Sequence, residues 1–189
     1  METGTMVGAM IYLTRRAEFS ASHYYHSPAL SPEENQRLYG KCNNPLGHGH
    51  NYVLEVTVEG EIDPRSGMVV DLKDLKEAMA REVLDVLDHR FLNREVPVFH
   101  HVIPTTENLA VEVWRMLAPK LDFCRLHRVR LYETPDLYVD YYGPEAARTA
   151  NGVVTFPKSM SGIRSPLICP GTRFFARGGN CESAGPWSR

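Results

Sequence analysis

Alternating apolar and polar positions in the first third of the chain predict two β-strands. Residues 10–23 and residues 48–60 both alternate in this way, and the apolar face of the first stretch includes Phe19, Ala21 and His23. Successive side chains of a strand point to opposite faces, so a period of two indicates a strand that buries one face. The two stretches therefore predict paired strands above a common core.

A period of three to four residues takes over after residue 70 and predicts two helices. Asp71 is a suitable cap for the first helix, whose apolar stripe runs from Leu72 to Leu87. Residues 105–107 open the second helix, which ends near Pro119. Stripes of this kind face a protein core. We expect both helices to lie against the sheet.

Two further strands are predicted at residues 127–133 and 137–142, where alternation returns. The Pro and Gly of residues 63–67 predict a hairpin turn that leads into Met68–Val70. Residues 27–41 are polar, and we expect them to form a long connecting loop. This loop ends at Cys42, so it is expected to carry chemistry to the rim of a site.

The apolar periodicity stops after Gly143, which divides the chain. We expect a flexible N-terminus at 1–9, one folded domain at 10–143 and a disordered tail at 144–189. The tail holds six Lys or Arg against two acids, within a net charge of −2 for the whole chain. That overall charge argues against a nucleic-acid binder.

Membrane and secretion signals are missing from the sequence pattern. No apolar run approaches the roughly 20 residues of a membrane span. The four cysteines lack CxxC spacing and form no disulfide framework, so reduced thiols are expected. We therefore predict a cytoplasmic protein without membrane contact.

Histidines on inward strand faces are the strongest chemical signal. His48 and His50 lie two apart, on the face that carries the apolar side chains, and His23 has the same placement on the preceding strand. Two surface histidines, or one core histidine, would be the simpler interpretation of each stretch alone. Three imidazoles together suit Zn²⁺ in a catalytic site, which has three protein ligands and one open position.

Other candidate groups have simpler interpretations when each is taken alone. Cys42 could be an ordinary packed thiol, although its polar, Gly- and Pro-rich surroundings argue against that. Asp88 and His89 could be a charge arrangement at a helix C-terminus. Glu133 ends an apolar strand face, where it is either solvated or accepts hydrogen bonds from a guanidine-like ring.

Taken together, these residues resemble the 6-pyruvoyl-tetrahydropterin synthase family over about residues 10–143. The resemblance is carried by His23, Cys42, the His-Gly-His of 48–50, Asp88-His89, Thr105-Thr106-Glu107 and Glu133. It implies an α+β T-fold, a four-stranded antiparallel sheet with two helices on one face. It also implies a barrel-forming homohexamer of two stacked trimers, with active sites between subunits.

The resemblance also implies a role for each candidate residue. Cys42 would be the catalytic base, Asp88 and His89 the relay that activates it, and Glu133 the anchor of the pterin ring. Three histidines would hold zinc, namely His23, His48 and His50. The pterin pocket would be lined by Thr105, Thr106 and Glu107.

The implied reaction converts 7,8-dihydroneopterin triphosphate into 6-pyruvoyl-tetrahydropterin with loss of triphosphate, in tetrahydrobiopterin biosynthesis. It would make the chain a zinc-dependent carbon–oxygen lyase that needs no external redox cofactor. The five residues between Cys42 and His48 favour this activity over the related 6-carboxytetrahydropterin synthases, whose spacing is typically shorter. Two rivals from other classes are a zinc hydrolase and a non-catalytic, zinc-stabilised binding module.

Overall fold

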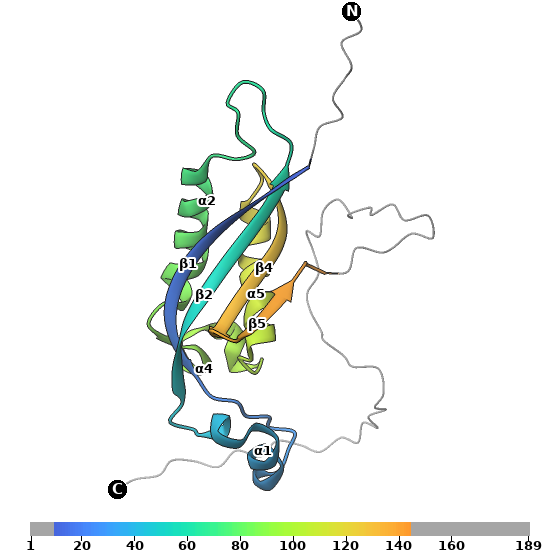
Figure 1. The fold of residues 1–189 in the computed structure, drawn as a ribbon. Coiled ribbons are helices and arrows are strands. Elements are labelled where there is room, and N and C mark those ends of the chain that lie inside the picture. Colours follow the sequence, from blue (N-terminus) through green and yellow to red (C-terminus); the bar gives the residue numbers. More distant parts are fainter. Residues whose placement is uncertain (1–9, 145–189) are drawn as a thin grey trace, which may run out of the picture.

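A single twisted sheet organises the computed structural model, which describes residues 10–144 (Figure 1). Four strands pair antiparallel as β1-β2-β4-β5, and a short fifth strand flanks β1. The four are β1 (Ile11–His23), β2 (His48–Gly60), β4 (Arg125–Thr134) and β5 (Leu137–Tyr141). These match the four predicted strands to within three residues at each end. The expected N-terminus at 1–9 and the expected tail at 144–189, apart from its first residue, lie outside the described residues.

The fifth strand corrects the predicted count of four. β3 (Arg90–Phe91) pairs in parallel with Ala21 and Ser22 of β1. The backbone N–H of His89 donates to the Ser20 carbonyl at 2.6 Å, which draws the chain alongside β1 as it leaves the helix. A strand of two residues has no alternation to read, so the sequence pattern did not predict it.

Two helical runs cover one face of the sheet, as predicted. The first is α2 (Leu72–Met79), a π-helical segment η2 (Ala80–Leu84) and α3 (Asp85–Leu87), while the second is α5 (Thr106–Leu117) followed by the 3₁₀ turn η4 (Ala118–Lys120). Asp71 and Thr105 cap their first turns by accepting backbone N–H groups. Figure 1 shows α2 beside β1 and α5 behind β4.

The polar stretch expected to be a loop contains a further helix. α1 (Pro32–Tyr39) runs into the 3₁₀ turn η1 (Gly40–Asn43). Ser31 and Glu34 form a reciprocal capping box at the start of α1. Helix α4 (Leu92–Glu95) and the 3₁₀ turn η3 (Pro97–His100) occupy the irregular stretch between the two helical runs.

The predicted hairpin strand at Met68–Val70 is wrong. The turn itself closes, because the N–H of Asp63 donates to the Met68 carbonyl at 3.0 Å. Helix α2 begins directly afterwards at the Asp71 cap, so too few residues remain for a strand. Residues 61–70 form the long loop at the upper end of the molecule in Figure 1.

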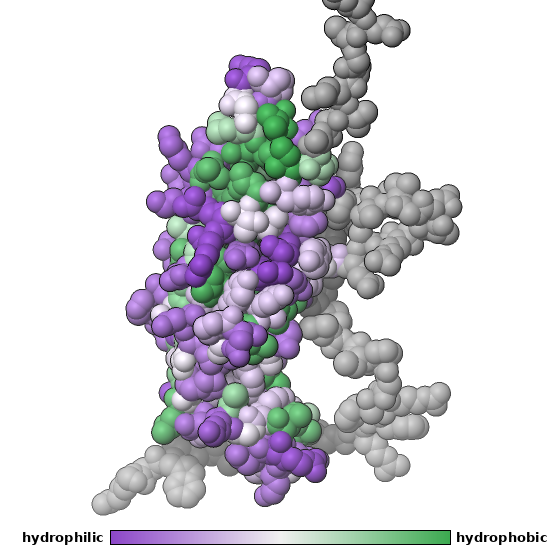
Figure 2. Space-filling model, viewed as in Figure 1, coloured by the Kyte–Doolittle hydropathy of each residue, from purple (hydrophilic) through white to green (hydrophobic). Residues whose placement is uncertain are grey.

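The core lies between the sheet and the two helical runs. Its largest fully buried side chains are Tyr52, Leu54, Leu75, Met79, Leu87, Leu92, Leu109, Leu117 and Leu131. The sheet face turned toward the viewer is mostly hydrophilic, with a hydrophobic patch toward the upper end (Figure 2). Within residues 10–144, every helix is too short or too polar to cross a membrane.

Candidate metal and catalytic site

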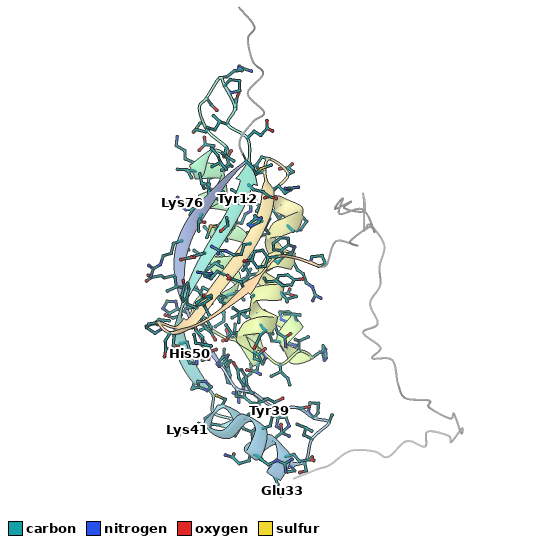
Figure 3. The ribbon with its side chains drawn as sticks, turned by 45° about the vertical axis from the view of Figure 1, so that its right-hand side comes forward. Tyr12, Glu33, Tyr39, Lys41, His50 and Lys76 are labelled. Atoms are coloured by element: carbon teal, nitrogen blue, oxygen red, sulfur yellow. The ribbon has the colours of Figure 1, made fainter. Side chains whose placement is uncertain are left out.

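Strand pairing brings the three predicted histidines together at the lower end of the sheet. His23 is the register partner of His48 across β1 and β2, and Ala21 is the partner of His50. All three imidazoles therefore point to the core side, with His23 fully buried and the other two half-buried. Figure 3 shows His50 at this end, between the strands and the segment of α1 that carries Tyr39.

A carboxylate completes the cluster. Ligand atoms of His23, His48, His50 and Glu133 all lie within 4.8 Å of one another. Glu133 Oε1 is 3.0 Å from His50 Nε2 and 3.8 Å from His23 Nε2. Glu133 reaches this position because β4 pairs with β2, which places the end of β4 beside the start of β2.

The donor atoms of this group fit a bound cation. The Nδ1 of His23 lies 2.9 Å from the Pro104 carbonyl, an acceptor only, so Nδ1 carries the proton and Nε2 presents a lone pair. His23 Nε2 and His48 Nε2 are 3.2 Å apart. Two nitrogens bound tetrahedrally to zinc at 2.0–2.1 Å would be about 3.3 Å apart. The spacing therefore matches that of zinc ligands.

Two buried polar atoms and the imidazole pKa values also indicate that this group can bind a cation. His48 Nδ1 and His50 Nε2 are buried and lack a hydrogen-bond partner among residues 10–144, although Glu133 lies close to the second. Burial, followed by the neighbouring His48 and His50, lowers the pKa of His23 to about 4. Burial, followed by His50, also lowers the pKa of His48. Neutral imidazoles are the form that binds metals.

Residues 105–107 divide into three different environments. Thr105 is the N-cap of α5, and its hydroxyl accepts the N–H of Asn108. Thr106 is buried and donates its hydroxyl proton to Glu133 Oε2. Glu107 is exposed on the first turn of α5. Within this chain, Thr106 is thus the member of the three that is bonded to the histidine–carboxylate group.

Cys42 lies on the segment that leads into β2. Its carbonyl accepts the N–H of Tyr25 at 2.8 Å, and the Asn43 side chain donates to the Tyr25 carbonyl at 2.7 Å. Burial raises the pKa of the half-buried Cys42 thiol, and the Glu133 carboxylate raises it further. The groups that act on this thiol therefore keep it protonated.

Asp88 and His89 form a pair that lies next to Ser20 of β1. Asp88 Oδ1 accepts the backbone N–H of Ser20 at 2.8 Å and lies 2.9 Å from His89 Nδ1. The Ser20 hydrogen bond, together with His89, lowers the pKa of Asp88. The exposed His89 borders a cavity with Ser20 and Gly49. Burial and Glu133 are the causes that raise the Cys42 pKa, and neither Asp88 nor His89 is among them.

Sequence reasoning missed two residues of this site. Tyr52 places its hydroxyl 3.1 Å from His23 Nδ1, and Tyr25 packs its ring against the His23 ring at 4.8 Å between centroids. The parity of β2 is a usable signal for Tyr52, since it shares the face of His50. No pattern marks Tyr25, because it follows the end of β1.

The fold and the site define the class of protein before any comparison. An antiparallel sheet with two helical runs on one face, and a three-histidine cluster at its end, is the arrangement of a T-fold protein with a candidate metal centre. Residues 12–144 match the sequence model of the family described as 6-pyruvoyl tetrahydropterin synthase. The chain belongs to this family.

Relatives in the family are similar over most of their own length. The 6-pyruvoyl tetrahydrobiopterin synthase of Homo sapiens is 51% identical over 131 residues, which cover 69% of this chain and 90% of that protein. The Poecilia reticulata protein of the same name is 50% identical over 132 residues, covering 70% and 90%. The structure of Caenorhabditis elegans 6-pyruvoyl tetrahydropterin synthase aligns with a TM-score of 0.70 at 42% identity, covering 72% of this chain and 98% of that one.

Proposed function

We propose that the chain converts 7,8-dihydroneopterin triphosphate into 6-pyruvoyl-tetrahydropterin with loss of triphosphate, a step of tetrahydrobiopterin biosynthesis. The observation that carries the proposal is the family match over 12–144, which spans the whole described domain apart from its first two residues. Relatives at about half identity carry the corresponding name. The same match argues against the zinc hydrolase and the non-catalytic module.

Zinc is the cation that we propose for the histidine group. His23, His48 and His50 would be the three protein ligands, which leaves a position open for the substrate. When bound there, zinc would supply Lewis-acid chemistry, stabilising charge that develops on substrate oxygens. The neutral state of the buried His23 and its bond to the Pro104 carbonyl support this assignment.

Glu133 is the proposed anchor of the pterin ring. Its Oε2 accepts from Thr106, while Oε1 faces His50. Each carboxylate oxygen has two lone-pair sites, so both can accept from the N–H and NH₂ groups of the ring as well. The anchor would therefore hold the ring next to the metal ligands, with the side chain of the pterin over the cation. Thr105, Thr106 and Glu107 are proposed to border the same pocket.

Cys42 is proposed to remove protons from the carbons of the substrate side chain. A thiol held in its protonated form needs activation, and Asp88 with His89 is the proposed relay. The observed contacts of this pair are with Ser20 and with each other, and we infer that the pair reaches Cys42 from a neighbouring copy. The metal, Cys42 and the relay would then meet only in an assembly.

The assembly that we propose is a homohexamer of two stacked trimers, with the sheets closing into a barrel. Support comes from the sheet edges, because within residues 10–144 β5 has a neighbour on one side only and β3 covers just two residues of β1. Open edges are normally paired or covered in proteins. We also propose a cytoplasmic location, with which the free thiols of Cys42 and Cys124 agree.

Product analysis tests the proposed function directly. The purified zinc-loaded protein is incubated with 7,8-dihydroneopterin triphosphate, and the pterin formed is identified by mass spectrometry. We expect 6-pyruvoyl-tetrahydropterin together with free triphosphate. Formation of 6-carboxytetrahydropterin would instead support the related synthase, and unchanged substrate would contradict both activities.

A further inference from the structure

Tyr52 is a fully buried residue of β2 that is neither a proposed metal ligand nor a proposed substrate-binding residue. It follows His50 by two positions, so its side chain shares the core face of the strand with that imidazole. Phe19 is its register partner on β1, and the two rings stack with centroids 5.0 Å apart and an angle of 15° between their planes. Stacked aromatic contacts favour a defined ring orientation. The Tyr52 hydroxyl is therefore held in one place.

That place is beside the metal-site residue His23. Tyr52 Oη is 3.1 Å from His23 Nδ1, and the Pro104 carbonyl oxygen is 2.9 Å from the same nitrogen. A carbonyl oxygen can only accept a hydrogen bond, so Nδ1 carries the proton. The Tyr52 oxygen, at an ordinary hydrogen-bond distance, then accepts from the same N–H in a three-centre bond. Two oxygens from different parts of the chain thus share one imidazole proton.

The shared proton decides what the other ring nitrogen of His23 can do. In a neutral imidazole only one ring nitrogen is protonated, so a proton on Nδ1 leaves a lone pair on Nε2. Nε2 is the atom that faces the cluster, at 3.2 Å from His48 Nε2 and 3.8 Å from Glu133 Oε1. The opposite tautomer would direct an N–H toward the other candidate ligands and leave a lone pair facing the Pro104 carbonyl. The two hydrogen bonds therefore favour the tautomer that binds a cation.

We propose that Tyr52 is a positioning residue for the metal, which acts through His23 by holding its Nδ1 proton and thereby directing its Nε2 lone pair toward the cation. The inference rests on the proposed function, in which His23 is a zinc ligand. A partner of this kind orients the imidazole and makes its free nitrogen a stronger base, and its removal lowers metal affinity roughly 10- to 100-fold. The Pro104 carbonyl remains as an acceptor when the Tyr52 hydroxyl is removed, so we expect a loss near the lower limit of that range.

The conservative variant Tyr52→Phe removes the hydroxyl and keeps the ring that stacks on Phe19. Bound metal is first removed from the purified protein, and zinc affinity is then measured by competition with a chromophoric chelator. The zinc dissociation constant of the variant should be about tenfold higher than that of the wild type. Tyr39→Phe is the matched control, because Tyr39 lies on α1, outside the paired strands, and its ring packs against Tyr25. Its zinc affinity should equal that of the wild type.

A double-mutant cycle tests whether Tyr52 acts through His23. In the His23→Ala background, the residual zinc affinity should be the same with Tyr or Phe at position 52, because the imidazole that the hydroxyl orients is no longer present. A further loss of about tenfold in that background would overturn the proposed route. It would assign the effect to His50, whose ring centroid is 5.7 Å from that of Tyr52.

The stability of the metal-free protein separates positioning from simple packing. A hydroxyl that only satisfies a buried polar group would change the denaturation midpoint of the metal-free protein and leave its zinc affinity unaltered. That result for Tyr52→Phe would contradict the inference. Positioning predicts instead that the folded variant binds zinc more weakly, so the midpoint gained on adding a fixed zinc concentration should be smaller than in the wild type.

Zinc binding and product formation are measured separately, so the inference and the proposed function can fail separately. A wild type that binds no zinc contradicts the zinc site of the proposed function, and the inference fails with it. A wild type that binds zinc but forms no 6-pyruvoyl product contradicts the proposed reaction alone. Equal zinc affinity in the wild type and in Tyr52→Phe contradicts the inference alone.

Discussion

His23 and His48 are register partners on adjacent antiparallel strands, and their Nε2 atoms lie 3.2 Å apart. Two lone-pair-bearing nitrogens at this distance repel each other unless a proton or a cation lies between them. The hydrogen bond of His23 Nδ1 to the Pro104 carbonyl fixes the ring, so the pair cannot simply turn apart. Strand pairing thus builds the candidate cation site into the fold itself.

Replacing either half-buried histidine should release the metal. His48→Ala or His50→Ala leaves two imidazoles, and affinity for zinc should fall by more than about 100-fold, beyond the loss seen when only a supporting contact is removed. Elemental analysis of the purified proteins measures the zinc content. His100→Ala, a histidine outside the cluster, is the control and should retain zinc. Full zinc occupancy in both site variants would contradict the three-histidine assignment.

Removal of the thiol should separate binding from chemistry. Cys42→Ala should keep zinc and bind substrate, while kcat falls by roughly 10²–10⁴-fold, the usual contribution of a positioned base. Elemental analysis, calorimetric titration with substrate and steady-state kinetics provide the three readouts. Cys124→Ala, the other free cysteine of residues 10–144, should leave kcat unchanged. Normal turnover by Cys42→Ala would make Cys42 a structural residue only.

Mixing two inactive variants tests whether sites are shared between copies. Cys42→Ala and His89→Ala should each be nearly inactive, yet a refolded mixture should regain part of the wild-type activity. Some interfaces in mixed assemblies would pair an intact Cys42 with an intact His89 from the next chain. Differently tagged chains reveal whether mixed assemblies form. Co-purification of both tags without any recovered activity would refute the shared site.

An ion pair on the outer face of the sheet gives a pH-dependent prediction. Arg130 donates two hydrogen bonds of 2.7 Å to Asp140, and this contact lowers the pKa of the Asp140 carboxyl. A lowered pKa stabilises the fold above the unfolded value of about 3.9, and the contribution is lost as pH falls through the folded value. Asp140→Asn should therefore cost about 1 kcal/mol at pH 7.

Denaturant titration at several pH values measures this cost. The difference between wild type and Asp140→Asn should be complete above about pH 5 and should shrink as pH falls below about 4. Glu18→Gln is the control, because its pair with Arg16 is mostly exposed and should contribute less than about 0.5 kcal/mol. A pH-independent difference for Asp140→Asn would assign its effect to something other than charge.

Much of the site could be predicted because strand parity is a local property. His23, His48 and His50 follow from alternation within their own strands, and antiparallel pairing then brings them together. The hydrogen bond between Thr106 and Glu133 could not be predicted in this way. It depends on how the start of α5 packs against the end of β4, which neither stretch encodes alone.

The errors in the predicted fold have similar causes. The capping box of Ser31 and Glu34 is a readable helix signal, but the high polarity of 27–41 favoured a loop. The helix α1 is stabilised by a polar residue rather than by an apolar stripe. The buried side chain of Asn35 forms hydrogen bonds with Ser27 and Leu30 and so holds the preceding turn. Because the buried residue of α1 is polar, this helix has no apolar stripe by which the sequence could predict it.

The backbone of His89 has a consequence for how this protein can evolve. Its φ of 58° places a non-glycine residue in the left-handed region, which costs roughly 1 kcal/mol. Selection for stability alone would favour Gly or Asn at this position. If His89 is the relay residue that we propose, descendants that keep the activity should retain this histidine despite its backbone cost. A lineage that lost the activity would be expected to replace it early.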